Sequence, residues 1–147
     1  MSTAAISETQ APALEFVGAI HEGIPVHPDR LDACIAFYRD VLGLKVIPRP
    51  PALDKLGKGA WLTDANERVQ FHLISNEAAL KPGPEAKIEP AGRHTAWRIQ
   101  DAAAFRARMD AIGQPYEEIG SLIGEPQLFV IDPEGHTWEF QQVPKAK

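Results

Sequence analysis

The sequence predicts an α+β fold built from two similar halves, each with the element order βαβββ. Strand-type and helix-type stretches follow one another in the same order twice, which indicates an internal duplication. A stretch rich in Pro, Gly, Glu and Lys, 76–90, separates the two repeats. Four polar residues with metal-binding chemistry also recur with similar spacing in both halves. Together these features predict one domain of two modules, long enough to bury a core without disulfides.

In the first module we expect a strand over 16–26, then a helix whose apolar residues are spaced by three and four, among them Cys34 as a core residue. Asp29 or Asp32 is predicted to cap this helix, and Gly43 supplies a left-handed end. Three strands follow in the pattern: 44–47, 59–63 and 68–74.

The second module repeats this order. We expect a strand over 94–99, a helix capped by Asp101 and ended by Gly113, and three strands over 116–119, 127–131 and 137–141. A turn over 132–135 joins the last two strands. The expected organisation is therefore a disordered N-terminus over 1–13, one domain over 14–143 and a tail over 144–147. Within the domain we place module 1 at 16–75, the linker at 76–90 and module 2 at 91–142.

Composition narrows the class of protein. The net charge of −5 and the lack of a Lys/Arg cluster argue against a nucleic-acid partner. No apolar run approaches the ~20 residues of a membrane span, and the N-terminus does not look like a secretory signal. One cysteine permits no internal disulfide, which agrees with a reducing cytoplasm. We expect a small cytoplasmic protein that binds a small-molecule substrate.

Four polar residues in strand-type stretches predict a metal site. His21 and His72 lie 51 positions apart, and His94 and Glu139 lie 45 apart. Because strand side chains alternate between faces, apolar neighbours can be buried while each of these residues projects from the opposite side. Three imidazoles and a carboxylate suit a divalent transition metal.

Several sequence elements together are similar to a known superfamily. They are His21-x-x-Ile24-x-Val26, the stretch from Ala36 to Leu44 (AFYRDVLGL), Phe71-His72-Leu73-Ile74 and the closing stretch from Asp132 to Phe140 (DPEGHTWEF). From about residue 16 to 142 the chain resembles the vicinal oxygen chelate superfamily, the glyoxalase, bleomycin-resistance and extradiol-dioxygenase group. The resemblance implies a glyoxalase-like curled mixed sheet around a metal cleft, and a homodimer.

The resemblance also places the metal ligands at the first and fourth strands of each module, namely at His21, His72, His94 and Glu139. It implies a divalent Zn, Ni, Fe, Mn or Co ion that chelates a substrate through adjacent oxygens. His72 departs from the carboxylate or amide that glyoxalase I enzymes usually have there.

Two points about the first strand stay open. The segment between Val26 and Phe37 is about two residues longer than is usual in the superfamily, so Gly23 rather than His21 could hold the first ligand position. Glu22 also falls on the face that normally packs beneath the helix, where a buried carboxylate would need a partner.

Other polar residues have expected roles near the site. Arg98 shares a strand face with His94 and could bind an anionic substrate group or pair with a Glu. Gln70 and Gln141 lie two positions from His72 and Glu139 and are candidates for hydrogen bonds that orient these ligands. We expect His136 at the surface and His27 in solvent.

Three functions fit the sequence. The first is a metal-dependent lyase or isomerase of the glyoxalase type, with Glu139 doubling as the catalytic proton shuttle. The second is an Fe(II) dioxygenase that uses His21, His94 and Glu139 as its triad, in which His72 would take up one open metal face. The third is a metal-free resistance protein that binds a drug in its cleft.

Overall fold

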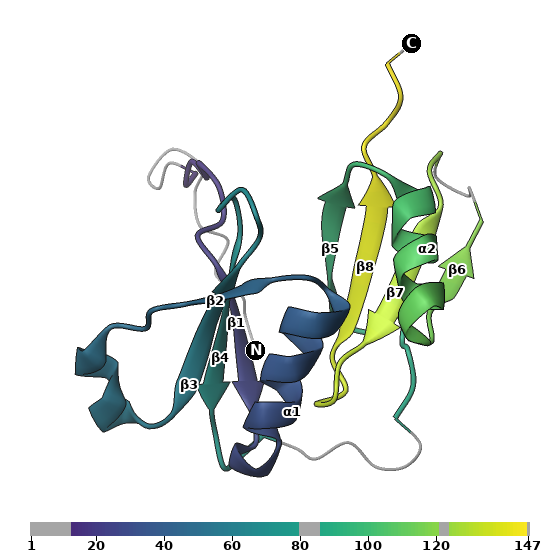
Figure 1. Cartoon of the computed structure of the whole chain (residues 1–147). Helices are drawn as coiled ribbons and strands as arrows, with labels where there is room; N and C mark the ends of the chain where they lie inside the picture. Colours follow the sequence, from purple (N-terminus) through teal and green to yellow (C-terminus); the bar gives the residue numbers. More distant parts are fainter. Residues whose placement is uncertain (1–12, 80–85, 121–123, 147) are drawn as a thin grey trace, which may run out of the picture.

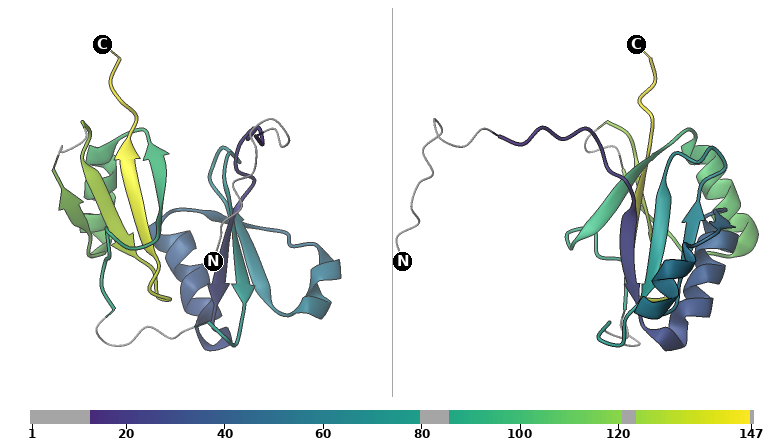
Figure 2. Two further views of the ribbon diagram at one scale, coloured as in Figure 1. Left: turned by 180° about the vertical axis from the view of Figure 1, so that it is seen from behind. Right: turned by 90° about the vertical axis from the view of Figure 1, so that its left-hand side faces the viewer.

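The α+β prediction is confirmed by a computed structural model of the chain, which describes residues 13–79, 86–120 and 124–146. Two four-stranded mixed sheets lie side by side (Figure 1; Figure 2, left). The first sheet holds β1 (Glu22–Val26), β2 (Lys45–Ile47), β3 (Gly59–Thr63) and β4 (Gln70–Ser75). The second holds β5 (His94–Ile99), β6 (Glu117–Ile119), β7 (Gln127–Ile131) and β8 (Thr137–Gln142).

The two sheets have the same topology, which confirms the duplication. Their strand orders are β1-β4-β3-β2 and β5-β8-β7-β6, so the first and fourth strands of each module are neighbours. These neighbours run parallel, and the other pairs are antiparallel. In the described part of the chain β1 and β5 do not pair. The two sheets therefore stay separate and do not form the single curled sheet that the resemblance implies.

The first helix differs from the uninterrupted helix that the sequence predicts. It runs as α1 (Leu31–Ala36) and continues as a wider π-helical turn, η2 (Phe37–Val41), where the amide of Leu42 donates to the carbonyl of Phe37 over 3.3 Å. The predicted end is confirmed, because Gly43 has a φ of 76°.

The predicted cap of this helix is wrong. A 3-10 turn, η1 (Pro28–Arg30), precedes α1 and is capped by His27, whose ring accepts from the amide of Asp29. The extra residues between the first strand and the helix are taken up in this turn. A second 3-10 helix, η3 (Pro51–Leu56), was not predicted, because its Pro-rich start resembles a loop.

Helix α2 (Ala102–Ile112) matches the prediction closely. The Asp101 carboxylate accepts from the amides of Ala103 and Ala104 at 2.8 and 3.2 Å. Gly113 ends the helix with a φ of 68°. Both signals are local in sequence, which is why they could be identified without the tertiary structure.

One hydrophobic core spans both modules. It joins residues from both sheets and from both helices, among them Ile24, Cys34, Tyr38, Leu62, Leu73, Met109, Leu128, Val130 and Trp138. The burial predicted for Cys34 is confirmed, since its exposed fraction is 0%. Because the helix residues of module 1 pack against strand residues of module 2, neither module has a complete core by itself.

A buried hydrogen-bond chain ties the first helix to the last turn of the chain. The Trp138 indole donates to the Tyr38 hydroxyl over 2.9 Å, and this hydroxyl donates to the Asp132 carboxylate over 2.7 Å. Asp132 also accepts from the amides of Glu134 and His136 over 2.9 and 2.8 Å. We call Tyr38, Asp132 and Trp138 the buried triad; its bonds satisfy the hydroxyl, the carboxylate and the indole that the modules bury there.

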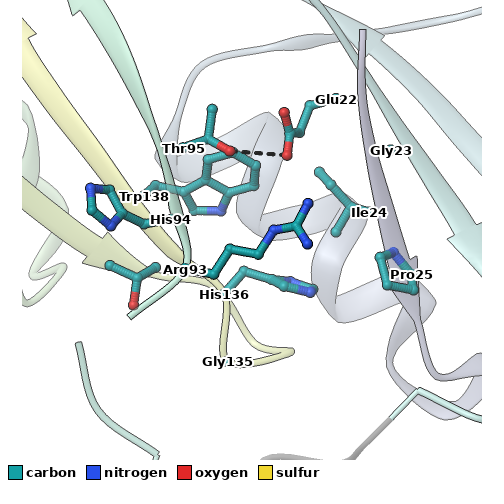
Figure 3. Close-up of a pocket in the computed structure, with 11 residues that line it drawn as sticks. Glu22, Gly23, Ile24, Pro25, Arg93, His94, Thr95, Gly135, His136 and Trp138 are labelled. Carbon is teal, nitrogen blue, oxygen red and sulfur yellow. Dashed lines mark hydrogen bonds between the residues drawn. The ribbon is translucent and has the colours of Figure 1, made fainter. Parts of the chain in front are cut away.

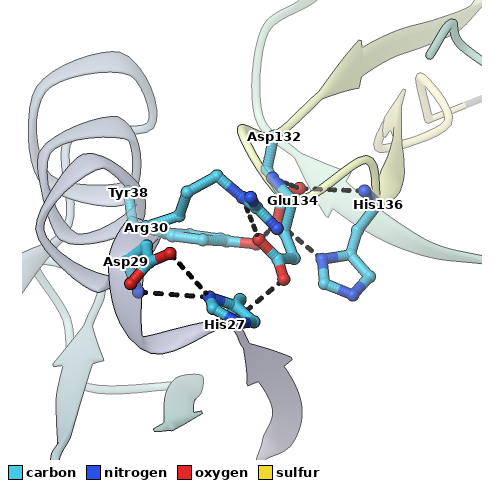
Figure 4. Close-up of polar contacts among 7 residues, drawn as sticks. All are labelled: His27, Asp29, Arg30, Tyr38, Asp132, Glu134 and His136. Atoms are coloured by element: carbon cyan, nitrogen blue, oxygen red, sulfur yellow. Dashed lines mark hydrogen bonds and ion pairs between the residues drawn. The ribbon is translucent and has the colours of Figure 1, made fainter. Parts of the chain in front are cut away.

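A salt bridge adjoins Tyr38 and Asp132 of the buried triad (Figure 4). The Arg30 guanidinium donates to Glu134 over 2.6 Å, and the side chain of Glu134 is 2% exposed. The backbone amide of His27 donates to the other oxygen of Glu134 over 2.8 Å. His27 is thus half-buried, and the prediction that it lies in solvent is wrong.

The first strand is shorter than predicted, since residues 13–21 lie outside any strand. Glu22 has the partner that its position requires, because the Thr95 hydroxyl donates to its carboxylate over 3.0 Å. The disorder predicted for 1–13 falls almost entirely outside the described residues, as does part of the linker predicted for 76–90. No helix in the described ranges is long and apolar enough to span a membrane.

Candidate metal centre

The second module brings two of the four predicted metal-binding residues into contact. His94 opens β5 and Glu139 lies on the neighbouring strand β8, where it pairs in register with Ala96. His94 Nε2 lies 2.8 Å from Glu139 Oε2. Glu139 is 3% exposed, so its carboxylate is held inside the protein, while His94 is only half-buried. We call these two residues the second half-site.

Two contacts fix the orientation of the His94 ring. His94 Nδ1 lies 2.9 Å from the carbonyl of Gly92, which can only accept, so Nδ1 carries a proton. Nε2 and the ionised carboxylate then face each other, and a proton or a metal ion must lie between them. Two ligands about 2.1 Å from one ion are roughly 3.0–3.4 Å apart, so the observed spacing needs only a small movement to admit a metal.

Three neighbours hold Glu139 in its ionised form. The amides of Gln127 and Gln141 donate to its Oε1 at 2.8 and 2.5 Å. Burial by itself would raise the pKa of this carboxyl, but the bonds from the two amides and from His94 outweigh it and lower the pKa. Oε2 therefore faces His94 as an anionic oxygen, which is the form that binds a cation.

The first module places His72 between two flat rings. His72 lies on β4 directly opposite Trp61 on β3, and their ring centroids are 3.9 Å apart with an interplanar angle of 1°. Nε2 of His72 donates to the side-chain amide oxygen of Gln70 over 2.9 Å, which leaves Nδ1 with the free lone pair. Burial, followed by the nearby His21, lowers the pKa of His72, so its ring is neutral and able to bind a metal near pH 7.

His21 stacks on the other face of His72 and does not share an ion with it in this conformation. The two centroids lie 3.9 Å apart with an interplanar angle of 19°. A ring nitrogen binds a metal in the plane of its ring, so two nearly parallel, stacked rings cannot reach the same ion. His21 is exposed and precedes β1, so its ring would have to turn before binding. We call His21 and His72 the first half-site.

The strand register makes His21, rather than Gly23, the counterpart of His94. Gly23 pairs with His72 in the first sheet, and Ala96 pairs with Glu139 in the second. His21 lies two residues before Gly23, and His94 lies two residues before Ala96, so the two histidines hold equivalent positions. The extra length that left this question open lies in η1 and not in the strand.

The two half-sites do not combine within one chain. Among the residues that the structure describes, no three His, Cys, Asp or Glu side chains lie together in a group that could hold a metal ion. The expectation that all four predicted ligands meet at one point is therefore not met by a single copy of the protein.

Arg98 is exposed on β5, and its guanidinium donates to the carbonyl of Gln142 over 3.2 Å. It makes no ion pair with a Glu among the described residues.

His136 is not the free surface residue that was expected, because its ring bonds Asp132 over 2.8 Å. Burial opposes the charge on His136, but the hydrogen bond and the charge of Asp132 raise its pKa.

A pocket of about 410 Å³ lies beside His94, between β1 and the start of β5 (Figure 3). It is lined by charged groups of both signs, Glu22 and Arg93, and by His136 and Trp138. Its volume is in the range of small-molecule sites. Glu139 does not line it, whereas Trp138, its neighbour on β8, does, so the pocket lies on the opposite face of the second sheet from the Glu139 carboxylate.

Residues 25–140 match the family model of the Glyoxalase/Bleomycin resistance protein/Dioxygenase superfamily. The chain belongs to this superfamily, which confirms the resemblance seen in the sequence.

Individual proteins are also similar to the chain. The uncharacterized protein PA2024 of Pseudomonas aeruginosa is 27% identical over 107 residues, which cover 71% of this chain and 68% of that protein. A crystal structure of a Bacillus anthracis protein assigned to the glyoxalase family has a TM-score of 0.67 at 22% identity, covering 88% of this chain and 98% of that one.

Two further solved structures carry functional names. Lactoylglutathione lyase from Agrobacterium tumefaciens has a TM-score of 0.58 at 22% identity, covering 86% of this chain and 96% of that one. A point mutant of the fosfomycin resistance protein FosX from Listeria monocytogenes, in complex with Mn(II) and 1S,2S-dihydroxypropylphosphonic acid, has a TM-score of 0.63 at 18% identity. This match covers 87% of this chain and 93% of that one. At these identities the structures show a shared fold.

Two contacts of the site were missed by the sequence reasoning. Gln127 donates to Glu139, and Trp61 stacks on His72. Both lie on strands that neighbour the ligand strands, so the signal for each was the pairing register, which sequence periodicity does not reveal. By contrast, Gln70 and Gln141 bond His72 and Glu139 as expected, because residues two apart in a strand share a face.

Proposed function

We propose that this protein is a metal-dependent lyase or isomerase of the glyoxalase type, which acts on a small, oxygen-rich substrate chelated to a divalent metal. The contact between His94 Nε2 and Glu139 Oε2 carries the proposal. Both atoms are oriented by other hydrogen bonds, and both lack a hydrogen of their own when Glu139 is ionised and His94 is neutral. The pair therefore has the donor set and the orientation of metal ligands.

The residues fit a divalent transition metal. His94 and Glu139 supply a nitrogen and an anionic oxygen, and neutral His72 supplies a second nitrogen. His21 adds a third nitrogen once its ring has turned out of the stack with His72. A bound metal of this class acts as a Lewis acid on hydroxyl, carbonyl and adjacent C–H groups of its ligand.

A second copy of the chain is needed to complete the site in this proposal. Each chain has one half-site of each kind, and these two do not meet within the described part of the chain. In a two-fold dimer the first half-site of one copy faces the second half-site of the other, and symmetry repeats the arrangement. The homodimer thus contains two equivalent metal centres.

The remaining side chains supply proton transfer and substrate binding. Glu139 is the catalytic base: its low pKa keeps it ionised, and loss of the Gln127 or Gln141 bond would raise its basicity. Arg98 lies on the same strand as His94 with its guanidinium exposed, so it can bind an anionic group of the substrate.

Metal analysis tests the proposal directly. The protein, purified without chelator, is reconstituted with Zn, Ni, Mn or Fe(II), and metal per chain is measured after dialysis. We expect near-stoichiometric binding of at least one metal and its loss in His94→Ala and Glu139→Gln, while His27→Ala serves as the matched histidine control. Less than about a tenth of an ion per wild-type chain with every metal would refute the proposal and favour the metal-free binding protein.

An Fe(II) dioxygenase is the second candidate, and one observation favours it. His72 is stacked against Trp61 and bonded to Gln70, and if these contacts hold its free Nδ1 away from the metal, His21, His94 and Glu139 alone would form a two-histidine, one-carboxylate set. His72→Ala separates the two functions. The lyase site should lose metal affinity severely, whereas the dioxygenase triad should keep Fe(II).

A further inference from the structure

Residues 14–20 carry four large apolar side chains that the chain leaves almost wholly in solvent. Leu14, Phe16, Val17 and Ile20 are 83%, 91%, 106% and 86% exposed. The other exposed large apolar residues of the described ranges, such as Leu56 and Ile112, are 39–77% exposed and occur singly. Scattered apolar residues are normal at a protein surface, but a continuous run of this kind marks an interaction site.

This run has strand-forming sequence but no strand partner in the described part of its own chain. β1 pairs with β4 only from Glu22 onward, where Glu22 lies opposite Phe71. β4 begins one residue earlier, at Gln70, because the preceding chain turns away. The Asp64 carboxylate holds that turn by accepting from the amides of Arg68 and Val69 at 2.6 and 3.1 Å. The segment before β1 runs away from both sheets (Figure 2, right).

The composition of the run favours a protein partner over a membrane surface. Its only charged residue is Glu15, so it lacks the Lys and Arg that attract an anionic lipid surface. The apolar residues also fall on both faces of an extended chain, since Phe16 and Val17 are neighbours. Apolar side chains on both faces must be buried. A groove or an interface between two proteins can bury both faces, whereas a flat surface buries only one.

We propose that residues 14–21, which we call the arm, pack against a second copy of this chain and thereby hold His21 in the metal centre. This inference rests on the proposed function, because the second copy is the partner that the two half-sites require. The arm is continuous with β1, whose outer edge is unpaired in the described chain, and it leads directly into His21. A docked arm therefore fixes the backbone on which the His21 ring turns.

The area of the arm suits this role. Four such side chains remove on the order of 400 Å² of apolar surface from water, and the surface that receives them loses a similar area. Two symmetry-related arms then bury on the order of 1,600 Å², the size of a standard protein–protein interface. The arms alone can thus supply the contact area of a stable dimer.

Sedimentation velocity over a range of protein concentrations tests the arm. The full-length double variant Phe16→Ser/Ile20→Ser is compared with wild type and with Leu56→Ser, a matched control that is 77% exposed on η3. We expect a wild-type dimer, an unchanged control and a double variant whose dimer Kd rises at least ~100-fold. Far-UV circular dichroism spectra should agree among the three, because all the altered side chains are exposed in the single chain and the fold of each copy does not depend on them.

A monomeric wild type at ~100 μM, or a double variant whose dimer Kd lies within about threefold of wild type, would overturn the inference. So would a wild-type monomer that binds vesicles of phosphatidylcholine and phosphatidylserine through the arm. Metal content is measured on the same samples. An arm-dependent dimer that binds no metal leaves the docking of the arm standing, but it removes the proposed function and with it the role of the arm in holding His21. If the dimer binds metal and the arm variant does not weaken it, the proposed function stands and the docking of the arm is refuted.

Discussion

Removing one oxygen atom, in Tyr38→Phe, should show how strongly the buried triad joins the two modules. The Tyr38 hydroxyl accepts from the Trp138 indole over 2.9 Å and donates to the Asp132 carboxylate over 2.7 Å. Tyr38 is 0% exposed, so water cannot replace the hydroxyl. The variant loses one neutral and one charge-assisted hydrogen bond and leaves the Trp138 donor unpaired.

These losses set the expected size of the effect. A neutral bond contributes about 1 kcal/mol and a bond to a charged group about 1.5–3 kcal/mol, so we expect the free energy of unfolding to fall by about 2–4 kcal/mol. For a chain of this length the Tm should fall by roughly 5–15 °C. Urea unfolding followed by tryptophan fluorescence measures the first quantity, and calorimetry measures the second.

The other tyrosine of the chain supplies the control. Tyr116 contacts Phe105 edge-on, and its hydroxyl has no hydrogen-bond partner among the described residues. Tyr116→Phe should change the free energy of unfolding by less than about 0.5 kcal/mol. If the two variants were equally stable, the buried triad would not stabilise the contact between the modules, and the reasoning would be refuted.

Three further predictions follow from the electrostatics of the chain. His136 has a raised pKa in the folded state, so its stabilising contribution is complete below the unfolded pKa of about 6.5 and is lost as the pH rises through the folded value. Unfolding free energies from pH 5 to 9 should therefore fall more steeply with rising pH in wild type than in His136→Gln; parallel curves would contradict this. Gln141→Ala should raise the pKa of Glu139 in a carbon-13 NMR titration, because it removes a donor to the ionised carboxylate, whereas Gln100→Ala should leave that pKa unchanged. Burial raises the pKa of the Cys34 thiol to about 12, so a thiol reagent at pH 8 should label the native protein very slowly and the urea-unfolded protein at once; rapid native labelling would show that the core opens there.

Much of the fold could be predicted from the sequence because its signals are local. Alternating residues predicted β3, β5 and β7 with the bounds that the structure has, and Asp101 and Gly113 marked the ends of α2. The same local logic paired Gln141 with Glu139, since residues two apart in a strand share a face.

Strand limits and contacts that depend on a neighbouring strand could not be predicted from the periodicity of the sequence. The run over 16–21 has strand-forming residues, yet β1 starts only at Glu22, because a strand exists only where a neighbour supplies hydrogen bonds. The contact of Gln127 with Glu139 was likewise missed, since it is set by the register between β7 and β8.

The sequence by itself determined the duplication, the family and which residues have metal-binding chemistry, because these follow from residue type and spacing. Only the tertiary structure decided how those residues are grouped. It places His94 against Glu139, stacks His21 on His72 and keeps the two pairs apart within the described chain. The physical reason is that strand alternation sets the face on which a side chain lies, whereas the packing of one sheet against another sets which faces meet.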